Sequence, residues 1–363
     1  MYDYLLTRII MASLTATPSP NTIDASKYAL VDLHLHLDGS LTPEDILTMA
    51  RLGGNEDELP STDPAELKRL LTCPPGTNNL VEYLKCFDLP IAMMQSHDPI
   101  AYSAYSLVKR LAAQGLLYSE IRFAPLQHTC KGISQDEVVR AAIDGLQRGM
   151  RECPEIKANF ILCCMRGRRH ELNYETIDLA KKYLGKGAVA IDLVGAEALY
   201  PTSDYRAYFE YATSIGVPFT IHAGEADGAI SITCALNYGA RRIAHGIRCF
   251  EHPAIMRRIR EMGVCLDICP KSNLDTHAIK GVERIENYPL RPILDAGVSV
   301  TINVDNLSVS DSTLVKEYDS LFRAGLLSEA EARAAVECAV SHAFIPEEEK
   351  KELLAKARRR MDA

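Results

Sequence analysis

The sequence predicts an α/β fold, namely a (β/α)₈ TIM barrel with a helical insertion after its first strand. Eight short apolar runs alternate with amphipathic helical patterns from about residue 29 to the end of the chain. The runs are rich in β-branched residues and nearly continuous, which is typical of parallel strands buried on both faces. A doubly wound open sheet is the alternative fold, but no GxGxxG fingerprint follows the first run.

The apolar runs predict strands over residues 29–35, 117–122, 159–164, 188–193, 218–221, 242–244, 264–268 and 298–303. Between them, apolar residues three and four positions apart predict helices, among them 136–150, 176–183, 254–261 and 313–324. About 80 residues separate the first two strands, with helical patterns over 43–51, 64–71, 80–87 and 98–113. An insertion at this point lies at the carboxyl-terminal mouth of a barrel, where it can cover a pocket.

The composition excludes several classes of partner. A net charge of −8 argues against nucleic acid, because binding a phosphate backbone requires a clustered positive surface. We expect no membrane association, because no apolar run reaches the ~20 residues that a membrane span requires. The eleven cysteines include no CxxC pair, which favours reduced core cysteines in a cytoplasmic protein over a disulfide framework. No protein partner is predicted.

The chain is expected to divide into a disordered N-terminal extension, residues 1–28, and a single domain, residues 29–363. Residues 5–14 are moderately apolar, but Asp3 precedes them, Arg8 interrupts them and no clear cleavage site follows. A disordered extension is therefore favoured over a signal peptide. We find no internal repeat, low-complexity tract or linker that would divide the rest of the chain.

Side chains that bind metals or protons gather where four predicted strands end, which is where barrel enzymes carry their working residues. The first strand holds His34 and His36, and residues two apart on a strand point to the same side, so both imidazoles can face one metal. The fifth, sixth and eighth strands end in TIHAGE, IAHG and TINVDN, which supply His222, Glu225, His245, Asp305 and Asn306. Three imidazoles and one carboxylate suit zinc, whose open position can hold an activated water.

These motifs resemble those of the adenosine deaminase family. HLHLDGS, SEIRFAP, DLVGAE, IHAGE, AHGIRC and NVDN occur in the family's order along nearly the whole chain after residue 29. HAGE followed by HG and VD(D/N) separates this family from the wider amidohydrolase superfamily. The resemblance implies hydrolytic deamination of adenosine, and of 2′-deoxyadenosine, to inosine and ammonia. It also implies one zinc ion per chain as cofactor and a small-molecule purine nucleoside as the binding partner.

The resemblance also implies a role for each matching residue. The zinc ligands are expected to be His34, His36, His222 and Asp305. The catalytic residues are expected to be Asp305, Glu225, which protonates the ring nitrogen beside the amine-bearing carbon, and His245, which orients and helps activate the zinc-bound water. Attack on the ring places negative charge on that nitrogen, so Glu225 must be a carboxylic acid whose pKa is raised by burial.

Substrate contacts are expected from His36, Asp38, Gly195 and Asn306. Gly195 offers a backbone contact to another ring nitrogen, and Asp38 holds a ribose hydroxyl. Asp38 has an alternative role as N-cap, because the following GSLTPED looks like a helix start. Asn306 stands where many family members have a second aspartate, and an amide can donate to the imidazole-ring nitrogen of a purine without any pKa shift. We expect Glu197 to be a buried structural carboxylate.

Alternatives stay open at this point. A binuclear amidohydrolase needs a bridging ligand at the end of strand four, commonly a modified lysine, and the IDLVGAE segment has none there. A catalytically inactive binding protein is disfavoured because every ligand and both proton-transfer groups are present. Within the deaminase class, adenine, adenosine monophosphate, aminodeoxyfutalosine and S-adenosylhomocysteine remain possible substrates, and Asn306 leaves room for a shifted purine preference.

Overall fold

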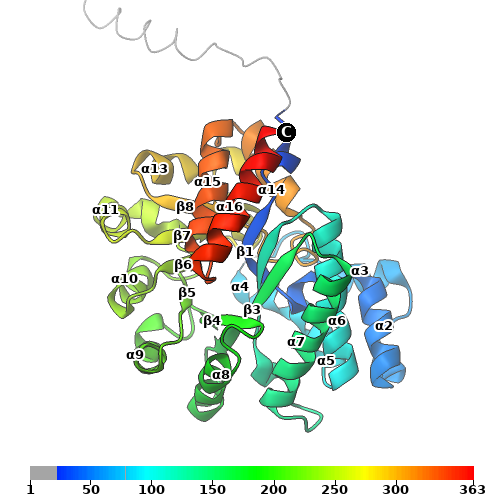
Figure 1. Cartoon of the computed structure of the whole chain (residues 1–363). Coiled ribbons are helices and arrows are strands. Elements are labelled where there is room, and N and C mark those ends of the chain that lie inside the picture. Colours follow the sequence, from blue (N-terminus) through cyan, green and yellow to red (C-terminus); the bar gives the residue numbers. More distant parts are fainter. Residues whose placement is uncertain (1–22, 78) are drawn as a thin grey trace, which may run out of the picture.

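The structure, a computed structural model, describes residues 23–77 and 79–363 as a barrel of eight parallel strands surrounded by helices (Figure 1). It confirms the predicted fold. Residues 1–22 of the expected extension lie outside the described residues. Residues 23–28 of that extension are described: Ala25–Lys27 forms a 3₁₀ turn, and Ala25 and Tyr28 are buried in the core.

The eight strands follow the chain order around the barrel. They are β1 (Val31–His36), β2 (Tyr118–Phe123), β3 (Lys157–Met165), β4 (Ala188–Val194), β5 (Thr220–Ala223), β6 (Arg242–His245), β7 (Cys265–Ile268) and β8 (Ser299–Ile302). They pair as two parallel sheets, β1 to β4 and β5 to β8. Backbone bonds from Ile191 N to the Pro218 oxygen (3.0 Å) and from Asp305 N to the His34 oxygen (2.8 Å) join the two sheets and close the barrel.

The predicted insertion between β1 and β2 is present and helical. It contains α2 (Pro43–Gly53), α3 (Pro64–Leu71), α4 (Leu80–Tyr83), α5 (Asp88–Met93) and α6 (His97–Ala113). The helix expected over 80–87 is divided, because its second half is the 3₁₀ turn Leu84–Phe87. Figure 1 shows α2 and α3 at the outer edge of the molecule.

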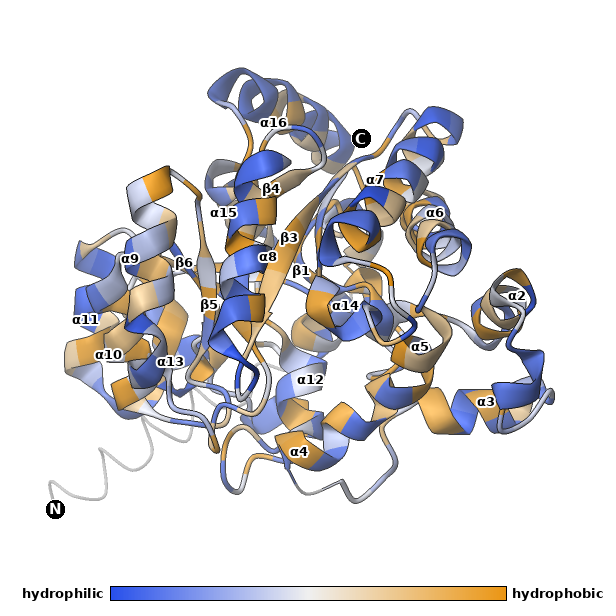
Figure 2. Ribbon diagram, turned by 90° about the horizontal axis from the view of Figure 1, so that it is seen from below, coloured by the Kyte–Doolittle hydropathy of each residue, from blue (hydrophilic) through white to orange (hydrophobic). Residues whose placement is uncertain are grey.

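The remaining helices alternate with the strands. They are α7 (Gln135–Glu152), α8 (His170–Lys182), α9 (Arg206–Ile215), α10 (Ala229–Tyr238), α11 (Pro253–Glu261), α12 (Pro270–Asp275), α13 (Leu290–Asp295), α14 (Leu314–Arg323), α15 (Glu329–His342) and α16 (Glu347–Asp362). Figure 2 shows hydrophobic strands such as β3 inside and the largely hydrophilic α16 outside. Among the described residues, no helix combines the length and hydrophobicity needed to cross a membrane.

The N-cap of helix α2 is Thr42, which settles one alternative for Asp38. The Thr42 side chain accepts from Asp45 N, and the Asp45 carboxylate accepts from Thr42 N, so the two residues form a capping box. Asp38 lies earlier, inside the separate 3₁₀ turn Asp38–Ser40. It is therefore not the N-cap of this helix and is available for another role.

The barrel interior contains charged side chains as well as apolar ones. The guanidinium group of Arg122 donates to Asp192 at 2.6 Å and to the Leu33 carbonyl at 2.6 Å, and it lies 3.6 Å from Asp267. Because these partners belong to β4, β1 and β7, Arg122 must lie inside the barrel. Buried charges of this kind are tolerated when each has a hydrogen-bonded partner of opposite sign.

Candidate active site

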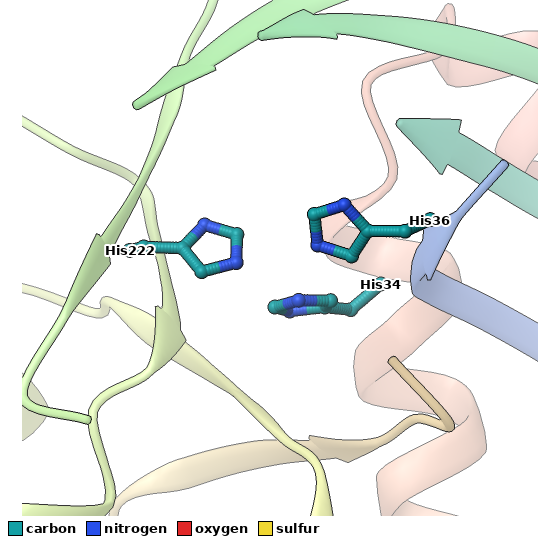
Figure 3. Close-up of side chains that lie close together, drawn as sticks. All are labelled: His34, His36 and His222. Carbon is teal, nitrogen blue, oxygen red and sulfur yellow. The ribbon is translucent and has the colours of Figure 1, made fainter. Parts of the chain in front are cut away.

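Three imidazole rings face one another at the carboxyl-terminal end of the barrel. His34 and His36 come from the end of β1, and His222 comes from β5; Figure 3 shows the three rings gathered around one space. The ring centre of His34 lies 4.7 Å from that of His222 and 5.6 Å from that of His36. One nitrogen of each ring lies within 4.8 Å of the others. The two histidines of the HxH motif therefore share one side of the strand, as predicted.

Asp305 brings a carboxylate to the same cluster. Its Oδ1 lies 3.4 Å from His34 Nε2 and 3.3 Å from His36 Nε2. His34 is completely buried, yet neither of its ring nitrogens has a hydrogen-bond partner in the described part of the chain. Buried polar atoms are normally paired, so these nitrogens point to a missing ligand. One of the two nitrogens can bind a metal ion, and the three imidazoles and one carboxylate fit a divalent cation.

Asp192 orients the imidazole of His222. Its Oδ2 lies 2.8 Å from His222 Nδ1, which directs the other ring nitrogen, Nε2, toward the cluster. Burial opposes ionisation of Asp192, but His222 and Arg122 outweigh burial and lower the pKa of this carboxyl group well below its usual range. Asp192 is therefore a carboxylate that fixes the ring and its tautomer, an arrangement common behind metal-binding histidines.

His245 and Asp305 share an unusual backbone geometry. Their φ angles are 61° and 67°, in the left-handed region that residues other than glycine rarely adopt. Such strain is commonly found at functional sites. The His245 side chain places its Nε2 3.7 Å from Glu225 Oε2. The strained positions are thus two of the residues that the sequence assigns to catalysis.

The Nδ1 atom of His245 takes part in a series of buried hydrogen bonds. Asn273 Nδ2 donates to His245 Nδ1 at 3.0 Å, and the Tyr288 hydroxyl donates to Asn273 Oδ1 at 2.8 Å. Burial lowers the pKa of His245 well below its usual range, so the ring is neutral. With Nδ1 as acceptor, the hydrogen of the neutral ring lies on Nε2, which faces Glu225.

Glu225 is held in place by Glu197. The Glu197 carboxylate accepts backbone N–H bonds from Gly224 (2.8 Å), Glu225 (3.1 Å), Ala226 (2.7 Å) and Asp227 (2.9 Å). Glu197 is only 1% exposed, so it is the buried structural carboxylate that we expected. Burial raises the pKa of Glu225 well above its usual value, and the nearby Asp305 and Glu197 raise it further. Glu225 is therefore a carboxylic acid that carries a proton.

A cavity of about 390 Å³ opens onto the cluster, a volume suited to a small molecule. All the predicted site residues except His34 line it: His36, Asp38, Gly195, His222, Glu225, His245, Asp305 and Asn306. Leu80, Tyr83 and Phe87 from the insertion line it as well, so the insertion covers the pocket as predicted. Gly195 has a φ of 106°, which only glycine adopts readily and which shapes the wall at the end of β4.

Two of the polar side chains in this cavity that have an atom without a hydrogen-bond partner among the residues described bear on substrate recognition. One is Asp38, whose Oδ1 is unpaired and whose pKa is raised to about 7 by burial. The other is Asn306, whose Oδ1 is unpaired while its Nδ2 donates to the Tyr83 hydroxyl at 2.9 Å. A Cβ atom at Gly39 would come within 1.8 Å of Asn306 Oδ1, which explains the glycine of the HLHLDGS motif.

Sequence reasoning did not identify Tyr83, Asp192, Ser272 or Asn273. Ser272 donates to Asp305 Oδ2 at 2.5 Å, and Asn273 donates to His245. Both residues follow β7, which lies between β6 and β8, the strands whose ends supplied predicted site residues. Asp192 had a detectable signal, because a charged residue in the middle of the apolar run AVAIDLV is unusual for a buried strand. Tyr83 had no such signal in the sequence, since an aromatic residue on an insertion helix is ordinarily a core residue.

Known proteins resemble this chain over most of its length. A family model described as adenosine deaminase matches residues 29–359. An adenosine deaminase from Haemophilus ducreyi is 43% identical over 339 residues, which are 92% of this chain and 97% of that protein. An adenosine deaminase from Enterococcus faecalis is 34% identical over 321 residues, which are 88% of this chain and 93% of that protein.

Solved structures with the same architecture include an adenine deaminase from Arthrobacter aurescens. It superimposes with a TM-score of 0.82 at 25% identity, covering 92% of this chain and 99% of that one. An N6-methyl-AMP deaminase from Arabidopsis thaliana has a TM-score of 0.78 at 24% identity, covering 92% and 98%. At 24% identity, the similarity to the Arabidopsis thaliana structure concerns the fold alone.

Proposed function

Because this chain belongs to the adenosine deaminase family, we propose that it is a zinc-dependent hydrolase that converts adenosine, and 2′-deoxyadenosine, to inosine and ammonia. One observation carries the proposal. A buried carboxyl group with a raised pKa, that of Glu225, lies 3.7 Å from His245 beside a cluster of metal-binding groups, and both residues line the same cavity as that cluster. A water-activating metal and a proton donor on one side of a cavity are the two groups that hydrolysis of an amidine requires.

We assign the metal to His34, His36, His222 and Asp305. Zinc suits this set because it accepts imidazole and carboxylate ligands and keeps an open position in catalytic sites. When bound, it supplies water that is acidic enough to act as a nucleophile at neutral pH. The end of β4 has no lysine to bridge a second ion, and its carboxylate, Asp192, is already engaged by His222 and Arg122. We therefore propose one zinc ion per chain.

The protein groups around the cluster move the protons. Glu225 delivers its proton to the ring nitrogen beside the amine-bearing carbon, where attack of water places negative charge. His245, neutral and carrying its hydrogen on Nε2, orients the attacking oxygen. One carboxylate oxygen of Asp305 accepts a hydrogen bond from Ser272, and the other faces His34 and His36. As the C–N bond of the resulting tetrahedral carbon breaks, the new hydroxyl group gives up its proton, and the amine leaves as ammonia with that proton.

The remaining cavity residues recognise the nucleoside. Asp38 offers its unpaired, buried Oδ1 to a ribose hydroxyl, and a free base has no hydroxyl to pair with it. Gly195 offers a backbone contact to a ring nitrogen. Asn306 uses one amide hydrogen on Tyr83, which leaves the second hydrogen for the imidazole-ring nitrogen of the purine. The Asp38 contact favours adenosine over adenine, the substrate named for the structural relative from Arthrobacter aurescens.

A substrate panel tests this function. Ammonia release is measured with adenosine, 2′-deoxyadenosine, adenine, adenosine monophosphate and S-adenosylhomocysteine, using protein whose metal content is determined beforehand. We expect about one zinc per chain and the highest kcat/KM for the two nucleosides. A preference for adenine would contradict the role of Asp38, and two metal ions per chain would favour a binuclear amidohydrolase. Release of ammonia from none of the five would reject a deaminase of these purines.

A further inference from the structure

A second cluster of reactive side chains lies at the opposite end of the barrel from the cavity. Cys265 is the first residue of β7, whereas the zinc ligands lie at the ends of their strands. Cys338 and His342 lie one turn apart on α15, which packs beside β8 (Figure 1). The two sulfur atoms are 3.4 Å apart, and Cys338 Sγ is 3.4 Å from His342 Nδ1. The eleven cysteines are all free thiols, so these two can still react.

The two thiols differ in exposure. Cys265 is completely buried, whereas Cys338 keeps part of its surface open to solvent. A cavity of about 380 Å³ reaches the cluster beside His342, Gly263 and Val264. The partial exposure of Cys338 makes it the more accessible of the two thiols, whereas Cys265 is shielded from solvent. This order is the one required of an attacking thiol and a resolving thiol.

The charges around the sulfur atoms favour the same order. The pKa of Cys338 is lowered to about 6, mainly by contact with the Cys265 thiol and also by His342. Burial and Asp267 act in the opposite direction but are outweighed. Burial raises the pKa of Cys265 well above its usual value. His342 places Nδ1 3.0 Å from the Cys338 carbonyl and Nε2 3.4 Å from the Gly263 carbonyl, so both nitrogens can donate as an imidazolium. Cys338 therefore lies between a thiol and an imidazole that both favour its thiolate form.

We propose that Cys338 and Cys265 form a reversible redox pair that reacts with hydrogen peroxide. The Cys338 thiolate attacks one peroxide oxygen, the O–O bond breaks, and Cys338 becomes a sulfenic acid while the second oxygen leaves and is protonated to water. The Cys265 sulfur then attacks Cys338, an S–S bond forms, the S–O bond breaks and a second water leaves. The two thiols lose two electrons, and the peroxide gains them.

A metal ion is the competing occupant of two sulfurs and one imidazole, but two contacts oppose it. His342 Nδ1, the atom that would bind the metal, already faces the Cys338 carbonyl at 3.0 Å and Ser341 Oγ at 3.0 Å. The guanidinium of Arg242 lowers the pKa of Cys265 electrostatically, while the carboxylate of Asp267 raises it. A thiolate is stabilised by these same positive groups. The surroundings therefore favour the redox pair.

The test is oxidation of the metal-loaded protein with small amounts of hydrogen peroxide, followed by mass spectrometry of intact protein and peptides. We expect the chain to lose the mass of two hydrogen atoms and to yield a linked peptide pair containing Cys265 and Cys338, reversed by dithiothreitol. In Cys265→Ser the reaction should stop at a sulfenic acid on Cys338, which dimedone traps. In Cys338→Ser, Cys265 should stay reduced. Cys130→Ser, which removes an exposed thiol, should still form the pair.

His342 provides a second variant that keeps both thiols. His342→Gln should form the same disulfide more slowly, because the cation beside Cys338 is lost. Equal oxidation rates in His342→Gln and the parent protein would overturn the assigned order of the two thiols. The proposal also fails if peroxide oxidises other cysteines while Cys338 stays reduced, or if a stoichiometric zinc ion at this cluster protects both thiols. Ammonia release from adenosine serves as a check on folding, since none of these residues lines the active-site cavity.

Discussion

The acidity of Glu225 depends on how little water reaches its carboxyl group. Only 4% of the residue is exposed, and burial is the main cause that raises its pKa. A carboxyl group with a raised pKa keeps its proton at pH values where an exposed glutamate has lost it. As the pH rises through that pKa the proton is lost, so the step that needs it must slow in alkaline solution.

Glu225→Gln keeps the shape of this side chain but carries no acidic proton. We expect turnover to fall by a factor on the order of 10²–10⁴, the usual contribution of a general acid, with metal content unchanged. In the parent enzyme kcat should fall on the alkaline side, and the variant should lack this decrease. The measurement is kcat against pH for both proteins. A loss smaller than about tenfold would show that Glu225 is not the proton donor.

His222, a proposed zinc ligand, lies at the mouth of the barrel and is 6% exposed, so we expect the fold to survive its removal. We expect His222→Ala to lose both zinc and ammonia release while keeping the circular dichroism spectrum of the parent. His252→Ala, which alters an exposed histidine before α11, is the matched control and should keep both. Full zinc occupancy in His222→Ala would refute the ligand assignment.

Residues that touch a ligand were easier to predict from the sequence than residues that hold them. His34, His36 and Asp305 end predicted strands, so periodicity alone places them at one end of a barrel. Asn273 reaches His245 only because the chain turns sharply after β7, and no periodic pattern records that turn. The same holds for the bond between Tyr83 and Asn306, which joins segments 223 residues apart.

At the scale of secondary structure, the eight strands were predictable because each is a short apolar run between polar segments. The predicted bounds differ from the observed ones by at most two residues. Pro64–Leu71 was predicted with its true bounds because Asp63 and the following proline mark its start. The division at Leu84–Phe87 was not predictable, because a 3₁₀ turn followed by another helix keeps nearly the same spacing of apolar residues.

The loop after β5 is the element on which the position of Glu225 depends. Glu197→Gln exchanges one acceptor oxygen for an NH₂ group that meets the backbone N–H donors of residues 224–227. We expect a loss of stability of about 1–3 kcal/mol or more, because buried donors lose their partner, together with reduced kcat and retained zinc. Urea unfolding and turnover measure the two effects. Unchanged turnover would show that the loop holds its shape without this carboxylate.

At the scale of the whole molecule, the barrel is held together from inside by ion pairs as well as by apolar packing. Arg242 on β6 pairs with Glu120 on β2 and lies 3.3 Å from Asp267 on β7. These residues are completely buried, so removal of one partner leaves an uncompensated charge. The pairs therefore contribute to the stability of the barrel rather than to its chemistry.

Arg242→Met tests this structural role. We expect the free energy of unfolding to fall by about 3–5 kcal/mol, the usual cost of breaking a buried ion pair, as measured by urea unfolding. The kcat of the folded fraction should stay close to that of the parent, because Arg242 does not line the cavity. A stability equal to the parent's would show that methionine packs in the barrel as well as the ion pairs do.

We propose that the metal-binding cluster, Glu225 and His245 together bind the hydrated, tetrahedral form of a 6-aminopurine nucleoside. The most direct measurement is inhibition by a nucleoside whose ring already carries a tetrahedral, hydroxyl-bearing carbon, compared with the affinity for adenosine. We predict tighter binding of the analogue by a factor within the ~10²–10⁸ range of transition-state analogues, and loss of most of this advantage in Glu225→Gln. An analogue that binds no better than adenosine, or loses nothing in that variant, would contradict the claim.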